Sequence, residues 1–314
     1  MGKRRIRLIK DKYKDFIIGG VDNNYDRRQE TEEKFSVKTY ENLEEAVSTF
    51  KPNIVFACTS PLSHGEIIKY ALSNDCDTFS EINLVSDTYD EIINLCESKK
   101  RIAFLSSTML YNDEIKFIMS KVDAKQNYSY TYHVGQYLPD WHPWEHYNDF
   151  FVSNKRTNGC REIMAIEFPW LIKAFGKVKE FYVIKDKKSK LNINYPDNYN
   201  IILKHENGTS GNITVDILCR KPIRHLVIYS DEQYISWEGT PNSLKEYSKE
   251  INDVQNINIY ENIIKEKGYA ETIIENDYIN EIDAAIESIT KGFNSNYSYY
   301  DDRYVLDLLD KIEE

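Results

Sequence analysis

The chain has 314 residues, of which 41% are hydrophobic and 29% charged, an ordinary balance for a globular protein with a sizeable core. At ~100–200 residues per domain, this length predicts two domains. The net charge of −11 argues against a general affinity for nucleic acid or for an anionic membrane surface. No apolar run approaches the ~20 residues that span a bilayer, so we expect no membrane partner.

The cysteines predict a reducing compartment. There are five, an odd number, and none forms a C-x-x-C pair. A reduced, cytoplasmic protein is the simplest interpretation. The basic N-terminus lacks the apolar stretch of a signal peptide, which agrees with this interpretation.

The first part of the chain alternates between helical and strand patterns. Residues 3–14 predict an amphipathic helix and Phe16 to Val21 a short strand. Further helices are predicted over 25–34, 42–50, 63–73 and 87–99, and further strands over 53–58, 77–81 and 102–106. Strands separated by helices form right-handed βαβ units, so we expect a Rossmann-like, doubly wound parallel sheet over residues 1–120.

The remaining chain is richer in strands. One strong helix is predicted early, over 160–175, and Pro169 should kink or break it near 165–168. Strands are predicted over 128–137, 178–185, 199–206, 211–220, 224–230 and 233–238, and closing helices over 271–291 and 299–313. Strands without helices between them predict an α+β domain with a large, open, mostly antiparallel sheet over residues 121–298.

Met1 and Gly2 resemble the end of a phosphate-binding loop. In a G-x-G-x-x-G motif the last glycine opens the first helix, and an acid about 20 residues on binds the ribose hydroxyls; Gly2 and Asp22 fit these two places. We therefore expect the natural protein to begin upstream of Met1, with the first strand of the sheet missing from this sequence. The alternative is that Gly2 simply follows an initiator methionine.

Several segments, taken in order, resemble the Gfo/Idh/MocA oxidoreductases. Residues 51–64 (KPNIVFACTSPLSH) resemble the fourth strand and following turn of that family, and residues 79–84 (FSEINL) stand where it carries a Glu-Lys-Pro signature. Residues 136–147 and 157–176 resemble the start of the substrate domain in a branch found with bacterial surface sugars. Residues 300–309 resemble the return helix, which implies that 299–314 packs back on the first domain.

The resemblance implies an NAD(P)-dependent oxidoreductase that acts on a sugar or sugar nucleotide in bacterial surface-polysaccharide biosynthesis, and that forms a homo-oligomer through its open sheet. Asp22 favours NAD as the cofactor, whereas Arg27 and Arg28 leave NADP open. The expected cofactor-binding residues are Gly2, Asp22, Thr59, Pro61, His64 and Glu81.

The sequence departs from the family at the residues that transfer protons in its usual mechanism. The signature lysine is replaced by Ile82 and its proline by Asn83. An ungapped alignment on Gly159 and Gly176 places Ile166 at the family's acid/base histidine and Ile163 at an acid that precedes it. Because isoleucine cannot transfer a proton, the usual mechanism is absent. The alternative function is a catalytically inactive member that binds nucleotide or sugar, or partners another enzyme.

Four residues are catalytic candidates: Glu81, His142, Glu162 and Glu167. Glu81 should end a strand at the ligand edge of the sheet, although it is equally a solvent-facing acid. His64 is a cofactor residue or an ordinary helix-start histidine. Glu167 lies one residue beyond position 166, which turns its side chain by about 100° on a helix.

Two segments are candidates for substrate binding. Trp141 and Tyr147 belong to an aromatic cluster that suits a sugar ring, or they anchor a structural loop. Lys155, Arg156 and Arg161 surround a helix start and form either an anion site or a solvated basic loop. Residues 142–146 (HPWEH) match a zinc pattern, but its proline and the lack of a third ligand predict no metal.

Overall fold

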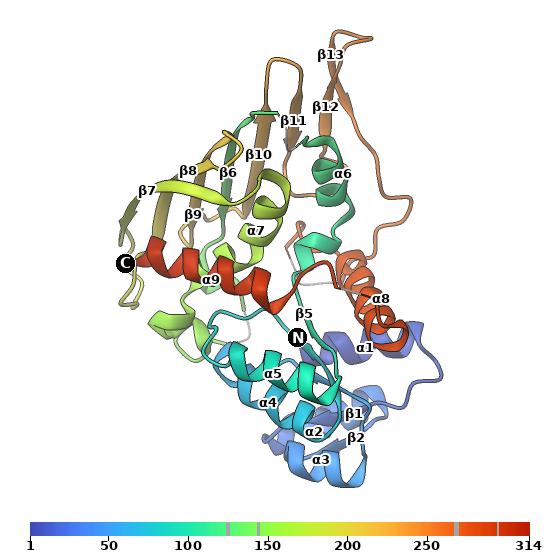
Figure 1. The fold of residues 1–314 in the computed structure, drawn as a ribbon. Coiled ribbons are helices and arrows are strands. Elements are labelled where there is room, and N and C mark those ends of the chain that lie inside the picture. The colour runs from blue at the N-terminus through green and yellow to red at the C-terminus, as the bar shows by residue number, and fades with distance from the viewer. Residues whose placement is uncertain (124–125, 143–144, 267–269, 294) are drawn as a thin grey trace. The chain divides into compact units, whose positions relative to one another are not determined.

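The computed structural model describes residues 1–123, 126–142, 145–266, 270–293 and 295–314 (Figure 1). It forms two compact units, which we call unit 1 and unit 2. Unit 1 consists of Met1–Ser106 and Glu281–Arg303, and unit 2 consists of Ser107–Asn280 and Tyr304–Glu314.

Unit 1 alternates helices with short parallel strands, as the sequence predicts. Its first five helices are α1 Gly2–Lys12, α2 Tyr25–Phe35, α3 Leu43–Thr49, α4 Pro61–Ser73 and α5 Tyr89–Lys99. Its strands are β1 Gly19–Val21, β2 Lys38–Tyr40, β3 Ile54–Ala57, β4 Asp77–Ser80 and β5 Ala103–Leu105. The strand β2 was not predicted, because three residues are too few for a periodic signal.

The parallel strands form two separate sheets, β1–β2 and β3–β4–β5. Among the described residues no strand joins β1 to β3. The usual doubly wound order places the first strand between the strands that correspond to β1 and β3.

Three stacked phenylalanines hold the β3–β4–β5 sheet together on one face. The ring centroids of Phe56 and Phe79 lie 4.7 Å apart, and those of Phe79 and Phe104 lie 5.5 Å apart. Phe79 and Phe104 are fully buried. This cross-strand ladder fixes the carboxyl ends of the strands, from which the candidate site is built.

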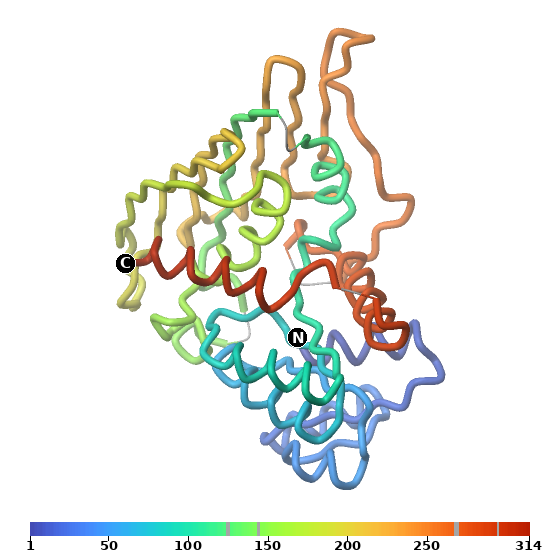
Figure 2. Tube along the Cα trace, in the orientation of Figure 1, coloured from blue at the N-terminus to red at the C-terminus, as the bar shows by residue number. Residues whose placement is uncertain are grey.

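Unit 2 contains the predicted open sheet. Its eight strands have the order β13-β12-β11-β10-β6-β9-β8-β7, and every neighbouring pair is antiparallel except β6–β9. The strands are β6 Ser129–Gly135, β7 Val178–Asp186, β8 Asn198–His205, β9 Ser210–Asp216, β10 Ile223–Tyr229, β11 Tyr234–Trp237, β12 Lys245–Ser248 and β13 Asp253–Asn256. The long β12–β13 hairpin (Figure 2), whose strands are polar, was not predicted.

The helices of unit 2 are α6 Asp113–Lys121 and α7 Gly159–Phe175, with single turns at Thr108–Tyr111, Leu138–Asp140, Phe151–Ser153 and Lys155–Thr157. Two later helices are divided between the units: α8 Glu275–Lys291 begins in unit 2, and α9 Tyr299–Glu313 ends in it.

Unit 1 ends at Ser106, earlier than the predicted boundary near residue 120. The reason is that α6 and the residue before it bind partners in unit 2. Asn112 donates to Asp277 at 3.0 Å, and Glu114 accepts a bond from the indole of Trp237 at 2.7 Å. Likewise, only the first turn of α9 groups with unit 1, rather than all of residues 299–314.

Helix α7 is continuous through Pro169, so the predicted break is wrong. Asn158 caps its start by accepting from the Arg161 N–H, and Gly176 ends it with a φ of 85°. Most of the helix is buried, including Phe168, Pro169 and Trp170. Tertiary packing on both sides therefore outweighs the one backbone hydrogen bond that the proline removes.

Candidate functional site

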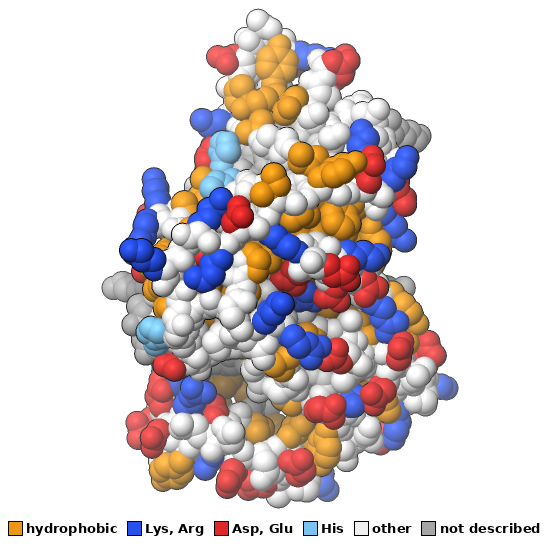
Figure 3. Space-filling view, turned by 90° about the vertical axis from the view of Figure 1, so that its left-hand side faces the viewer, with side chains coloured by type: hydrophobic (Ala, Val, Ile, Leu, Met, Phe, Trp, Pro, Cys, Tyr) orange, Lys and Arg blue, Asp and Glu red, His pale blue; other side chains and the backbone are white. Residues whose placement is uncertain are grey.

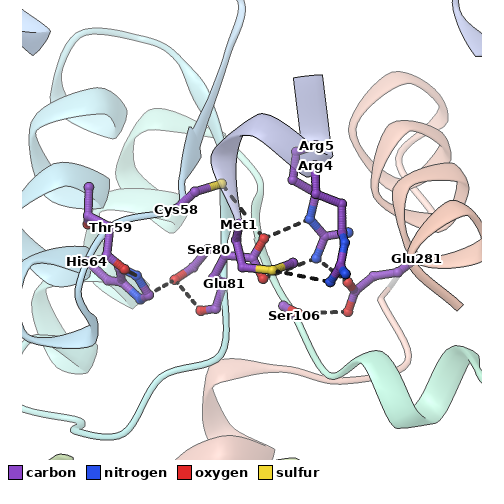
Figure 4. Close-up of polar contacts among 10 residues, drawn as sticks. All are labelled: Met1, Arg4, Arg5, Cys58, Thr59, His64, Ser80, Glu81, Ser106 and Glu281. Carbon is purple, nitrogen blue, oxygen red and sulfur yellow. Dashed lines mark hydrogen bonds and ion pairs between the residues drawn. The ribbon is translucent and has the colours of Figure 1, made fainter. Parts of the chain in front are cut away.

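The candidate cofactor site lies at the carboxyl ends of β3, β4 and β5 in unit 1 (Figure 4). Cys58, Glu81 and Ser106 each follow one of these strands directly. Sheets of this kind bind their ligands at this edge. The cysteine thiol lies 3.7 Å from Oε1 of Glu81.

A buried arginine connects the strand ends to two helices. Arg5 of α1 donates from Nε to Glu81 Oε1 at 2.7 Å and from Nη2 to Glu81 Oε2 at 3.1 Å. The same Nη2 donates to Glu281 Oε2 of α8 at 2.6 Å. The Ser106 hydroxyl donates to the other oxygen of Glu281 at 2.8 Å. We call Arg5, Glu81 and Glu281 the buried ion triad.

The guanidinium decides the ionisation of the triad. Burial by itself raises the pKa of Glu81, but the charge and hydrogen bonds of Arg5 outweigh burial and hold this pKa below its usual value. Burial raises the pKa of Glu281, and Arg5 offsets this only in part. Glu81, which is 8% exposed, is therefore a fixed carboxylate that positions its neighbours and is poorly suited to transferring a proton.

His64 lies deep in unit 1, with both ring nitrogens engaged. Nδ1 lies 2.8 Å from Oδ1 of Asn83, and Nε2 lies 3.0 Å from the Thr59 carbonyl oxygen. Burial lowers the pKa of His64, which keeps the imidazole neutral. Asn83, at the position of the signature proline, donates from Nδ2 to the Tyr89 hydroxyl at 3.0 Å. A pocket of about 180 Å³ borders these residues.

The other predicted cofactor residues lie at the ends of strands or at the starts of helices. Gly2 opens α1, whose N-terminus has no side-chain cap, and Pro61 opens α4. Thr59 lies between β3 and α4, and its hydroxyl lies 2.8 Å from that of Ser63. An uncapped helix start after a strand fits a pyrophosphate.

Asp22 directly follows β1, where a ribose-binding acid is expected. Its Oδ1 accepts from the Asn24 N–H at 2.8 Å, which leaves the second carboxylate oxygen for a ribose hydroxyl. Arg28 donates from Nη1 to the Asp22 carbonyl at 2.8 Å and lies over the Tyr25 ring. Arg28 is thus held beside the acid, while Arg27 is exposed.

The two candidate acids on α7 in unit 2 differ sharply. Glu167 accepts from the Tyr132 hydroxyl at 2.7 Å and from the Trp170 indole at 2.8 Å, and it pairs with Arg224 at 2.7 Å. Both of its oxygens are therefore committed to packing. Glu162 has a buried Oε2 with no hydrogen-bond partner, and burial raises its pKa to about 8.

Glu162 also stands four residues, about one helical turn, before Ile166. An acidic group is therefore present on α7 although the histidine is absent.

The aromatic cluster joins the start of α7 to neighbouring loops. The Trp141 indole donates to the Gln136 carbonyl at 3.1 Å, and its ring lies 3.4 Å from where a Cβ on Gly159 would stand. The Tyr147 hydroxyl accepts from the Asn192 N–H at 3.1 Å. Nδ1 of His142 lies 2.8 Å from Oε1 of Glu145. Residues 143–144 of the zinc pattern lie outside the described residues.

The basic residues near α7 are only partly available to a ligand. Lys155 and Arg156 are exposed, on a single turn before α7. Arg161 is 4% exposed and pairs with Asp310 at 2.7 Å and with Glu313. The prediction of Arg161 as a substrate residue is therefore not supported, because α9 already neutralises it.

Sequence reasoning missed the buried roles of Arg5, Glu281 and Tyr195. Arg5 stands in a basic run, and nothing local distinguishes it from the half-buried Lys3 or Arg7. Over the described residues there is no group of three metal-ligating side chains, and no helix there is long and apolar enough to cross a membrane.

Comparison with known proteins gives one family match and many similar folds. Residues 1–106 match the model of an oxidoreductase family with an NAD-binding Rossmann fold. No curated protein sequence matches the chain.

Three solved structures illustrate the similarity of the fold. Myo-inositol 2-dehydrogenase from Lactobacillus plantarum has a TM-score of 0.79 at 12% identity, covering 99% of this chain and 92% of its own. UDP-N-acetylglucosamine 3-dehydrogenase GnnA from Acidithiobacillus ferrooxidans has a TM-score of 0.75 at 12% identity, covering 99% and 93%. An oxidoreductase from Agrobacterium radiobacter, in complex with NAD⁺, L-tartaric acid and magnesium, has a TM-score of 0.78 at 12% identity, covering 98% and 91%.

The buried ion triad makes a stability prediction. Arg5→Met leaves Glu81 and Glu281 buried without their cation, which should lower the free energy of unfolding by about 3–5 kcal/mol at pH 8. The loss should be smaller at pH 5, where the carboxylates can take up protons. Lys12→Met, which removes only an exposed pair of the same helix with Asp283, should cost at most about 1 kcal/mol. Urea denaturation measures both, and equal losses would contradict the prediction.

Proposed function

Since residues 1–106 belong to the Gfo/Idh/MocA oxidoreductase family, we propose that the chain is an NAD(P)-dependent oxidoreductase of a sugar or sugar nucleotide in which Glu162 handles the substrate proton. The single observation that carries this proposal is the buried Oε2 atom of Glu162 on α7, which has no hydrogen-bond partner. The similar folds named for an inositol and a UDP-sugar dehydrogenase support a polyhydroxylated substrate.

The chemistry requires one acceptor for a hydride and another for a proton. A bound nicotinamide would accept the hydride from the alcohol carbon. The hydroxyl proton would pass to the Glu162 carboxylate as the carbonyl forms. Neither Ile82 nor Ile166 can take this proton, Glu81 is held by Arg5, and Glu167 is held by three donors. Glu162 is the candidate acid that remains.

Two broader features belong to the same proposal. The likeness of residues 136–147 and 157–176 to the surface-sugar branch supports a role in bacterial surface-polysaccharide biosynthesis. The five cysteines are all free thiols, which supports a reducing compartment such as the cytoplasm.

A second candidate function is a catalytically inactive family member that binds nucleotide or sugar or partners another enzyme. It is favoured by the hydrocarbon side chains at 82 and 166. Binding of cofactor and sugar with no change in absorbance of the reduced nicotinamide, across a broad panel of sugars and sugar nucleotides, would establish it.

The proton role of Glu162 predicts a pH profile. The base must be ionised, so the rate of alcohol oxidation should rise with pH, reach half of its maximum at about pH 8 and level off only above that. Glu162→Gln should lower kcat by about 10²–10⁴-fold with cofactor affinity unchanged. Glu180→Gln, at an exposed acid of β7, is the control and should retain wild-type turnover. A Gln variant that keeps the wild-type rate would exclude Glu162 as the base.

Asp22 predicts a preference for NAD over NADP. A free carboxylate oxygen can accept from a ribose hydroxyl and repels a 2′-phosphate. Asp22→Ser should weaken NADH binding by about 10–100-fold, the worth of hydrogen bonds to a charged group. Calorimetric titration with NADH and NADPH measures the change, with Asp26→Ser as the control. Tighter binding of NADPH by the wild type would reverse the assignment in favour of Arg28.

We also propose a homo-oligomer formed through the open sheet of unit 2. Tyr182 and Ile184 of β7 and Ile202 of β8 are 67%, 68% and 53% exposed. Tyr182 and Ile202 are cross-strand partners, so these side chains form one apolar patch. Exposed apolar patches mark association surfaces. Hydrophobic side chains lie among charged ones on the face shown in Figure 3.

The oligomer is tested by sedimentation velocity. Ile202→Lys should convert the assembly to a monomer, because a lysine within a packed apolar patch leaves a buried charge unpaired. Ile17→Lys, at a position 84% exposed in unit 1, should leave the assembly intact. A wild-type protein that sediments as a monomer at micromolar concentration would refute the proposal.

A further inference from the structure

Two buried polar atoms near the first turn of α7 form no hydrogen bond with good geometry. One is Oε2 of Glu162, and the other is the hydroxyl of Tyr195, a residue that is only 2% exposed. An unsatisfied buried polar atom costs about 1–3 kcal/mol, so two at one place are uncommon in a folded protein. Such a pair indicates a place where a ligand completes the hydrogen bonding.

Tyr195 is held at the start of α7 by the loop between β7 and β8. Its hydroxyl lies close to the Gly159 N–H, although the two do not form a hydrogen bond with good geometry. The loop is fixed by Asp197, a fully buried residue that accepts bonds from the backbone N–H groups of Lys188 and Ser189 at 2.7 and 2.9 Å. The hydroxyl is therefore positioned rather than free to turn outward.

The neighbouring aromatic side chain adds an apolar surface. The Trp141 ring packs against Gly159, the first residue of α7. An aromatic ring beside two polar groups is typical of sites that bind a sugar ring.

Within the first turn of α7, residues 159–162, no cation is left to bind a phosphate, and the exposed Lys155 and Arg156 lie one turn earlier, on Lys155–Thr157. Arg161, in the same helical turn, is neutralised by Asp310 and Glu313. Burial raises the pKa of Glu162 to about 8 and also raises the pKa of Tyr195, so both groups are uncharged near pH 7. Asp197 lies near enough to disfavour an anion further. A protonated carboxyl and a phenol can each donate and accept a hydrogen bond, so the two groups can bind two adjacent hydroxyls of one sugar or polyol.

We propose that Tyr195 binds the hydroxyl next to the one whose proton passes to Glu162, and that this site takes an uncharged polyol or sugar ring and no phosphate group. The inference rests on the proposed function for the role of Glu162. It adds a substrate-positioning residue and excludes a phosphorylated sugar from this place, so any nucleotide part of the substrate would extend away from α7.

The first measurement needs no ligand. Removing an unpartnered buried hydroxyl should not destabilise the protein, so Tyr195→Phe should leave the melting temperature unchanged or raise it. Tyr130→Phe is the matched control, because the buried Tyr130 hydroxyl lies 3.0 Å from Nε2 of His205 and its loss should lower the melting temperature. A fall for Tyr195→Phe equal to that of Tyr130→Phe would overturn the inference, since the hydroxyl would then have a structural partner.

The second measurement uses binding. Calorimetric titration with myo-inositol, glucose and glucose 6-phosphate, with and without NADH, should show binding of a neutral compound and weaker binding of the phosphate. Tyr195→Phe should lower the affinity for the neutral ligand by about 3–10-fold, which corresponds to the loss of one hydrogen bond. It should also raise KM with kcat nearly unchanged. Tyr130→Phe should leave this affinity unchanged.

The outcomes separate this inference from the proposed function. Tighter binding of glucose 6-phosphate than of glucose, or an unchanged affinity in Tyr195→Phe, would overturn the inference alone. Binding of NADH but of none of the neutral compounds would also overturn it, while leaving cofactor binding in place. Binding of a neutral sugar that depends on Tyr195, without any binding of NADH or NADPH, would support the inference and refute the oxidoreductase.

Discussion

A guanidinium buried between two carboxylates is the constraint on which unit 1 depends. Arg5 is 1% exposed, and a charge this deep is tolerated only when it is paired and hydrogen-bonded. Its three bonds connect α1, the end of β4 and α8, and its charge keeps Glu81 ionised. The strand ends that would face a cofactor are thereby fixed, and Glu81 is removed from the set of groups that can exchange protons.

The same principle separates the two acids of α7. Glu167 is surrounded by a hydroxyl, an indole and a guanidinium, so its burial is compensated and its role is to attach the helix to the sheet. Glu162, five residues earlier, is buried without such partners. Burial without compensation is what raises a carboxyl pKa toward neutrality, where an acid/base is most effective.

Under the proposed function, the isoleucines at 82 and 166 do not remove all proton chemistry. Glu162 supplies a carboxyl whose pKa burial raises to about 8, and the Tyr195 hydroxyl lies near it. The β1–β2 and β3–β4–β5 sheets are separate at the place where a dinucleotide fold has its central strand.

The sequence by itself determined the kind of fold and the location of its ligand edge. The alternation of apolar runs with amphipathic ones is a local signal, so it predicted the elements from α1 to β5 except β2, the strands β6 to β11 of the open sheet and the helix α7 to within a few residues. The segment around Thr59 and Pro61 was singled out by its resemblance to the family, and Asp22 by its distance from Gly2. Only tertiary structure decided which charged residues were free. Arg5, Arg161 and Glu167 look like any surface charge in the sequence, and each is neutralised by a partner between 57 and 276 positions away. Tertiary structure also decided that Pro169 does not break α7, that α6 belongs to unit 2, and that Tyr195 lies near Glu162. Those outcomes depend on which distant side chains share one desolvated space, and no local pattern encodes that.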